Sequence, residues 1–104
     1  MTRGTTPTHV FTVDPQILSG GVSAVFITYA QNGRVMIEKS TQDVVVGENT
    51  LTVKLTQEDT LKLYAPSSDT EVEIQIRIKT NSGEALASNV ILTTVSDVLK
   101  DGAI

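Results

Sequence analysis

Apolar and polar residues alternate along much of the chain, most regularly between residues 71 and 79. This stretch reads Glu-Val-Glu-Ile-Gln-Ile-Arg-Ile-Lys, with an apolar side chain at every second position. A period of two puts Val72, Ile74, Ile76 and Ile78 on one face of a β-strand and the polar side chains on the other, a separation that no helix achieves. The pattern predicts an antiparallel strand with one face buried in a core.

Strand-like runs also fill the N-terminal third of the chain. Residues 9–13 form a short run, and the Asp-Pro pair that follows ends it, since proline cannot donate a backbone hydrogen bond to a sheet. A longer run at 22–31 is separated from another at 34–39 by Asn32-Gly33. Both residues of this dipeptide tolerate the positive φ of a type I′ turn, so the two runs are predicted to pair as a hairpin.

A second hairpin is predicted in the middle of the chain. Gly47-Glu48-Asn49 joins a strand at 43–46 to a strand at 50–55, in which alternate apolar side chains share one face. Thr56 follows, with two acidic residues shortly after it. This pattern is typical of the N-cap of a short helical turn that carries carboxylates near its positive end.

The C-terminal part is predicted to hold the last strand. A turn at 81–84 leads into a strand at roughly 85–95, and residues 96–104 either start a short helix or lie extended. About seven strands with hairpin turns and one short helical turn indicate an all-β fold, an immunoglobulin-like antiparallel β-sandwich. The chain then divides into a flexible N-terminal arm at 1–8, a β-sandwich domain at 9–95 and a C-terminal tail.

Composition narrows the functions open to such a domain. The formal net charge is −4 and there is no Lys/Arg cluster, which argues against nucleic acid as a partner because phosphate binding depends on grouped positive charge. The chain has no cysteine, so it cannot hold a disulfide or a zinc-thiolate site. Its start lacks an apolar secretory signal, and no segment approaches the ~20 apolar residues of a membrane span. We therefore expect a soluble protein with no membrane partner.

No group of residues predicts catalysis or a cofactor. His9 is the only histidine and has no partner in a metal or triad pattern, so we expect it at the surface or edge of a strand. The acidic residues do not follow the spacing of a calcium loop, and the glycines lack the flanking sequence of a phosphate-binding loop. Serine and threonine hydroxyls have no adjacent base to activate them. The sequence indicates a protein that is not an enzyme, with no catalytic, metal-binding or cofactor-binding residues.

Contact with other proteins is the kind of function that remains. A small sandwich has edge strands whose unpaired amides can bind another chain. The apolar residues at 17–18, at 44–45 and in the tail either complete the domain's own core or, with the arm, reach onto neighbouring subunits. The second interpretation predicts a homo-oligomer whose partner contacts come from Arg3, Thr5, Thr6, Pro7, Ile17, Leu18, Val98 and Leu99. It also predicts that removal of residues 1–8 spares folding and weakens assembly.

Several strings of sequence are distinctive in their order. They are Arg3-Gly4-Thr5-Thr6-Pro7-Thr8 ahead of the strand Phe11-Thr12-Val13, then Ile27 to Gly33, Glu38-Lys39, Leu55 to Leu61, and Val72 to Arg77. Over most of the chain this order resembles a family of short proteins encoded in the tail regions of phages and prophages of Gram-positive hosts. The layout also resembles the N-terminal domain of phage baseplate upper proteins, in which a helical stalk with receptor-binding parts follows. We expect these residues to supply only the docking module.

The resemblance implies a non-enzymatic phage virion protein, a small tail or baseplate connector that docks onto other tail or baseplate proteins. It implies synthesis in the cytoplasm of the host and residence in the virion. The alternative is a phage-encoded intracellular binder that inhibits a host defence protein, which the absent active site fits equally well. Self-assembly distinguishes the two, since a connector should oligomerise or bind tail proteins. A carbohydrate-binding sandwich is disfavoured by the shortage of aromatic residues.

Overall fold

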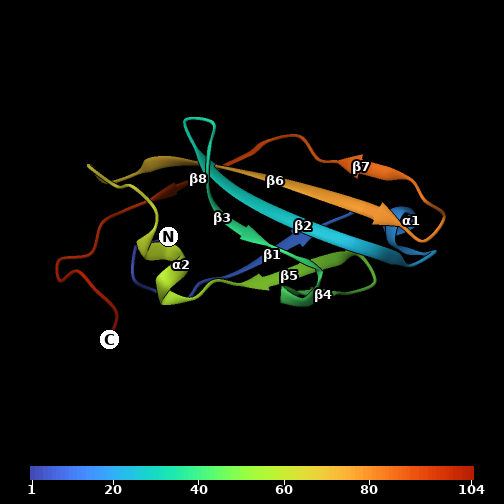
Figure 1. The fold of residues 1–104 in the computed structure, drawn as a ribbon, viewed down its shortest axis with the longest axis horizontal. Coiled ribbons are helices and arrows are strands. Elements are labelled where there is room, and N and C mark those ends of the chain that lie inside the picture. The colour runs from blue at the N-terminus through green and yellow to red at the C-terminus, as the bar shows by residue number, and fades with distance from the viewer.

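Two antiparallel β-sheets pack face to face in the computed structural model, which describes residues 1–104 (Figure 1). Eight strands, two short α-helices and one 3-10 turn follow in the order β1 (Thr8–Thr12), α1 (Pro15–Leu18), β2 (Val22–Gln31), β3 (Arg34–Lys39), η1 (Thr41–Asp43), β4 (Val44–Val46), β5 (Thr50–Lys54), α2 (Gln57–Leu61), β6 (Thr70–Thr80), β7 (Ala85–Ala87) and β8 (Ile91–Val95). The α-helices have four and five residues, and no helix is long and apolar enough to cross a membrane.

The strand order is that of an immunoglobulin-like sandwich. One sheet has the order β1-β5-β4, and the other has the order β3-β2-β6-β7, with β8 also paired to β6. When β1 is taken as strand B of the immunoglobulin fold, the sheets read B-E-D and C′-C-F-G, with β7 and β8 sharing the position of strand G. No strand occupies the strand A position beside β1. The predicted fold class is confirmed.

The strand with the most regular alternation, β6, lies at the centre of the five-stranded sheet. It pairs with β2 along one edge and with β7 and β8 along the other. Val72, Ile74, Ile76 and Ile78 are buried, and the residues between them are half-buried or exposed. These four side chains belong to one core of sixteen apolar residues that draws on both sheets. The predicted buried face of this strand is confirmed.

Both predicted hairpins are present. Asn32 and Gly33 connect β2 to β3 with φ values of 51° and 75°, the positive values that a type I′ turn requires. In the second hairpin, β4 and β5 pair antiparallel with Val44 opposite Val53. The turn residues therefore set the pairing of neighbouring strands in each sheet.

Side-chain caps fix both α-helical turns. Thr56 accepts a hydrogen bond from the backbone N–H of Asp59, and the Asp59 carboxylate accepts one from the N–H of Thr56, so α2 begins where the sequence predicted. The helix α1 was not predicted. Asp14 caps it by accepting from the N–H of Gln16, and Pro15 takes the first helical position, where a missing N–H removes no helical hydrogen bond. The Asp-Pro pair thus starts a helix as well as ending β1.

The predicted last strand is split into β7 and β8, which is why the sandwich has eight strands instead of seven. The interruption lies at Ser88-Asn89-Val90. There the Oγ of Ser88 accepts a hydrogen bond from the N–H of Ile76, while the Ser88 N–H donates to the carbonyl of Ile76. A serine hydroxyl replaces a backbone acceptor of the sheet, a substitution that an apolar-polar pattern does not reveal.

The N-terminus is bound to the domain, in contrast to the flexible arm expected at residues 1–8. Residues 1–3 run parallel to the end of β8, and a β-bridge joins Thr2 to Ser96. The Ser96 N–H donates to the carbonyl of Met1, and the N–H of Arg3 donates to the carbonyl of Ser96. This free edge of β8 gives the polar N-terminal segment the hydrogen-bond partners that its own composition lacks. Residues after Ser96 form neither helix nor strand.

Candidate docking surface

An apolar groove opens between β1 and the β7–β8 edge of the other sheet. Its volume is about 350 Å³, and nine of its eleven lining residues are hydrophobic. Those that define its walls are Val10, Val13, Ile17, Ile78, Leu86 and Ile91. The lining therefore combines residues of both sheets with a residue of α1.

The groove forms because the strands around it cover the core of the sandwich incompletely. Exposed fractions along the buried face of β6 rise from 0% at Val72 to 5% at Ile76 and 7% at Ile78. The adjacent strand β7 has only three residues, and no strand pairs with the outer edge of β1. The incomplete cover leaves apolar side chains at the rim, where Val10 is 60% exposed and Ile91 is 37% exposed.

The strand β1 offers unpaired backbone groups beside this groove. Successive residues of an antiparallel strand direct their N–H and C=O groups to opposite sides. The carbonyl of Pro7 and the N–H of Val13 both bond to the chain at the ends of β5, so the odd-numbered residues between them face β5. The backbone groups of Thr8, Val10 and Thr12 point outward, where another strand can bind them. The side chains of these three residues are exposed and uncharged.

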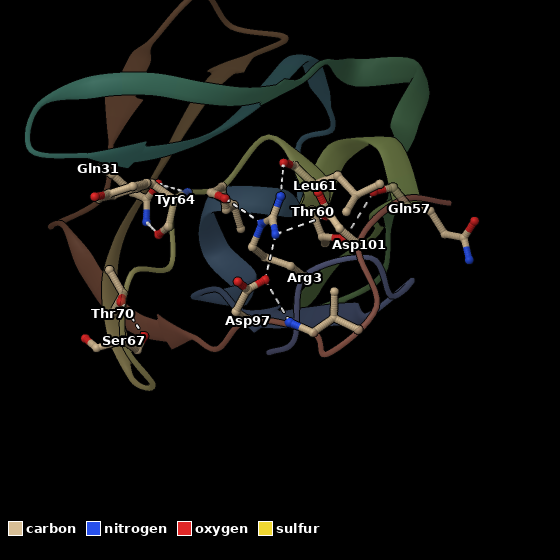
Figure 2. Close-up of polar contacts among 12 residues, drawn as sticks. Arg3, Gln31, Gln57, Thr60, Leu61, Tyr64, Ser67, Thr70, Asp97 and Asp101 are labelled. Atoms are coloured by element: carbon tan, nitrogen blue, oxygen red, sulfur yellow. Dashed lines mark hydrogen bonds and ion pairs between the residues drawn. The ribbon is translucent and has the colours of Figure 1, made fainter. Parts of the chain in front are cut away.

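Arg3, predicted to contact a partner, instead joins the two ends of the chain to the domain (Figure 2). Its Nε donates to the carbonyl of Leu63 at 2.8 Å and its Nη2 to that of Leu61 at 3.0 Å, at and just after the end of α2, where helical carbonyls are left unpaired. Its Nη1 lies 2.6 Å from Oδ1 of Asp97 and 3.3 Å from Oδ1 of Asp101. The hydrogen bond from Arg3 lowers the pKa of Asp97. Arg3 therefore bonds within the chain, and its contact with a partner stays a prediction.

The other predicted contact residues near the groove and in the tail differ in their accessibility. Leu18 belongs to the buried core of the chain, and its contact with a partner stays a prediction. Ile17 is half-buried and lines the groove. Val98 is half-buried near Gly4, whereas Leu99 is fully exposed. Ile17, Val98 and Leu99 each leave apolar surface accessible, and Leu99 leaves the most.

The remaining predicted contacts, Thr5, Thr6 and Pro7, lie in the N-terminal segment. Thr5 donates through Oγ1 to the carbonyl of Thr2, and its own carbonyl accepts a hydrogen bond from Oγ1 of the buried Thr60. Thr6 is exposed and Pro7 is half-buried, with its carbonyl bonded to the sheet. The segment is held through its backbone, and the side chain of Thr6 remains accessible.

Two polar pairs inside the domain were missed by the sequence analysis. The Nδ1 of His9 lies 2.6 Å from the Tyr29 hydroxyl, and burial lowers the pKa of His9 while it raises the pKa of Tyr29. The Nζ of Lys39 lies 2.6 Å from Oδ2 of Asp59, with both side chains largely buried. Burial opposes the charge of Asp59, but hydrogen bonds from Lys39 and Thr56 outweigh it and lower the pKa of Asp59.

These pairs connect elements of the fold. His9 and Tyr29 join β1 in one sheet to β2 in the other, and Lys39 and Asp59 join β3 to α2. None of the four residues lines a cavity. No three His, Asp or Glu side chains gather closely enough to hold a metal ion. His9 does lie in an edge strand, as predicted, but its ring faces the interior.

Comparisons with known proteins identify no family. No family model matches the chain, and no curated protein matches it. Among solved structures, the V domain of amphioxus IgVJ-C2 is similar with a TM-score of 0.34 and 14% identity, over 91% of this chain and 96% of that chain. A similarity at this level carries no argument about function. The assignment to the immunoglobulin-like class rests on the strand order.

Proposed function

We propose that the protein is a non-enzymatic docking module of a phage tail or baseplate. The observation that carries the proposal is the apolar groove beside the unpaired edge of β1. A strand that pairs with such an edge gains backbone hydrogen bonds, and alternate side chains can enter the adjacent groove. This surface suits another protein chain better than a small polar substrate.

The assignment to a phage particle is supported by the strings that resemble tail-region proteins. Two of these strings contact each other in the structure. The string at 55–61 contains the capped helix α2, and Arg3, from the string at 3–8, donates a hydrogen bond to the carbonyl of its last residue, Leu61. The resemblance therefore covers parts of one structural unit that are distant in the sequence. Such a pattern is expected when the layout of a whole domain is shared.

The non-enzymatic part of the proposal is supported by the use of the titratable groups. The inward-facing His9 and Tyr29 bond to each other, and the Lys39–Asp59 pair is closed by the cap of α2. Each group is engaged within the fold, and none of the four lines the groove. The groove itself offers apolar side chains for binding and no acid-base pair for chemistry.

Quantitative mass spectrometry of purified particles tests the proposal. We expect the chain at a fixed copy number relative to the major tail proteins, in particles released by the phage or prophage that encodes it. Absence from particles, with the protein abundant in infected cells, would contradict residence in the virion. That outcome would favour the alternative, an intracellular binder of a host defence protein, for which capture of one host protein from infected cells is expected.

A further inference from the structure

We propose that two copies of this chain bind each other by pairing their β1 strands antiparallel about a two-fold axis at Val10. The inference deepens the proposed function, on which it rests, because it names one docking contact and its occupant. Three features support it: the chemistry of the strand edge, the symmetry of that edge and the groove beside it.

The edge of β1 is the least protected strand edge in the structure. Its sequence Thr-His-Val-Phe-Thr has no Lys, Asp, Glu or Pro, the residues with which edge strands commonly prevent pairing. By contrast, the edge strand β3 carries Arg34, Glu38 and Lys39, and the strands β4 and β7 have three residues each. Part of the β8 edge is already occupied by the N-terminal residues. Among the sheet edges, β1 alone is five residues long, uncharged and free.

The outward-facing positions of β1 are complementary to themselves. They are Thr8, Val10 and Thr12, spaced evenly about Val10. An antiparallel strand of the same sequence sets Thr8 opposite Thr12 of the second copy and Val10 opposite Val10. Opposed β-branched and hydroxyl side chains are favourable cross-strand neighbours. Because the same patch serves both copies, the contact is closed and does not propagate into a fibre.

The charge of the chain also favours this edge for a second copy. Two copies with a net charge of −4 each repel each other overall, but the exposed side chains of β1 carry no charge. Pairing joins the two three-stranded sheets into one sheet of six strands and brings the grooves beside the axis. The exposed surface of Val10 and Ile91 then leaves water, which favours association.

This arrangement leaves the ends of the chain free for other contacts. Both termini lie at one end of the molecule, whereas α1 and β7, which line the groove, lie at the other end (Figure 1). The C-terminal end, marked in Figure 1, lies away from α1 and β7, and its last residue, Ile104, is fully exposed, as is Leu99. A dimer built on β1 therefore presents two such ends, one from each copy, to neighbouring proteins.

A single engineered cysteine tests the register. The chain has no cysteine, so in Val10→Cys the only disulfide that can form joins two copies. Opposed residues of a hydrogen-bonded antiparallel pair have Cα atoms about 5.5 Å apart, within the roughly 4.4–6.8 Å that a disulfide spans. We expect Val10→Cys to form a covalent dimer under mild oxidation, detected by non-reducing electrophoresis and intact mass.

The control uses the same strand and the same exposed face. In Thr12→Cys, the two substituted positions are four residues out of register and about 14 Å apart, too far for a disulfide. A mixture of Thr8→Cys and Thr12→Cys should instead form the mixed covalent dimer. The proposal is overturned if Val10→Cys stays monomeric, or if Thr12→Cys alone cross-links as fast as Val10→Cys.

Light scattering on the unmodified chain provides an independent readout. We expect a dimer that dissociates on dilution, a monomer for Val10→Lys because two like charges then face each other, and a dimer for Val45→Lys. Val45, 70% exposed on β4, is the matched control at the opposite edge of the same sheet. A monomeric native chain, or loss of the dimer in Val45→Lys alone, overturns the β1 contact. Neither result bears on whether the chain is present in particles. The β1 contact can therefore be contradicted while the proposed function stands, and the reverse.

Discussion

Arg3 has a structural role that its place near the N-terminus conceals. Its acceptors on Leu61 and Leu63 lie 58 and 60 residues away in the sequence, and its side chain is only 16% exposed. A string of small polar residues around an arginine predicts an exposed segment. Composition shows how hydrophobic a segment is, but it does not show that carbonyl groups distant in the sequence will accept hydrogen bonds from the arginine. The sequence singled out Arg3 as a partner contact, and the structure adds its bonds within the chain.

Replacing this arginine should weaken the whole domain. We expect Arg3→Ala to lower the free energy of unfolding by about 1–3 kcal/mol, because two partly buried carbonyls lose a charged donor. Urea unfolding measures the change. Arg34→Ala, at an exposed position at the start of β3, is the control and should change stability by less than about 0.5 kcal/mol. Equal effects of the two substitutions would contradict the role assigned to Arg3.

His9 should make stability depend on pH just below neutrality. Burial, and then the charge of the N-terminus, lowers its pKa from the ordinary value of 6.5. The unfolded chain binds the proton more readily, so stability is fully present above pH 6.5 and decreases as the pH falls toward the folded-state pKa. Urea unfolding at a series of pH values from about 7.5 to 5 measures the decrease.

The variant His9→Gln should flatten this pH dependence, since an amide does not titrate. The lowered pKa of Asp59 acts in a different range, because the stability that it provides is lost only as the pH falls below 3.8. An unchanged slope between about pH 7.5 and 5 in His9→Gln would show that another group titrates there.

Most strands could be predicted from the sequence. One face of each sheet is buried, so apolar and polar residues alternate along the strands. A period of two in β6 and the Asn32-Gly33 turn are local signals, and both act over neighbouring residues. The split between β7 and β8 depends on the hydroxyl of Ser88 bonding to another strand, which no local pattern records. The helix α1 was missed because its cap, Asp14, also suits the end of a strand.

The buried face of β6 can be tested directly. Ile76→Asp places a carboxylate in the core at a residue that is 5% exposed, and we expect a loss of at least about 4 kcal/mol, enough to unfold a domain of ordinary stability. Circular dichroism and thermal unfolding measure this. Arg77→Asp, on the exposed face of the same strand, should remain folded. An unchanged melting temperature for Ile76→Asp would overturn the assigned face.

At the scale of the whole molecule, the chain ends contribute to stability. The molecule measures 46 × 26 × 17 Å, and both termini lie at one end of its long axis (Figure 1). We expect removal of residues 1–7 to lower the free energy of unfolding by about 3 kcal/mol, since the backbone bonds to Ser96 and the contacts of Arg3 are lost. This expectation replaces the earlier one that the segment is dispensable for folding.

Thermal unfolding of the truncated chain provides the measurement. Removal of residues 102–104 is a suitable control, because these residues are exposed and lie outside the sheets, and it should have little effect. If the N-terminal truncation leaves the melting temperature unchanged, residues 1–7 are a free arm after all.

The candidate docking surface could be predicted only in outline. Edge strands and apolar excess were visible in the sequence, and Ile17 was identified among the contact residues. The groove itself depends on which strand lacks a neighbour, and that follows from the order of strands in two sheets rather than from any one segment. The residues that form its rim, Val10 and Ile91, are ordinary strand residues in the sequence.

The composition of particles that carry an altered β1 edge tests directly whether the chain docks in the virion through this strand. The native chain, Val10→Lys and Val45→Lys would each be supplied to the phage, and their copy number per particle measured by quantitative mass spectrometry. We expect equal incorporation of the native chain and Val45→Lys and depletion of Val10→Lys, with all three folded by circular dichroism. Absence of the native chain from particles, or equal incorporation of all three, would contradict docking in the virion through β1 and its groove.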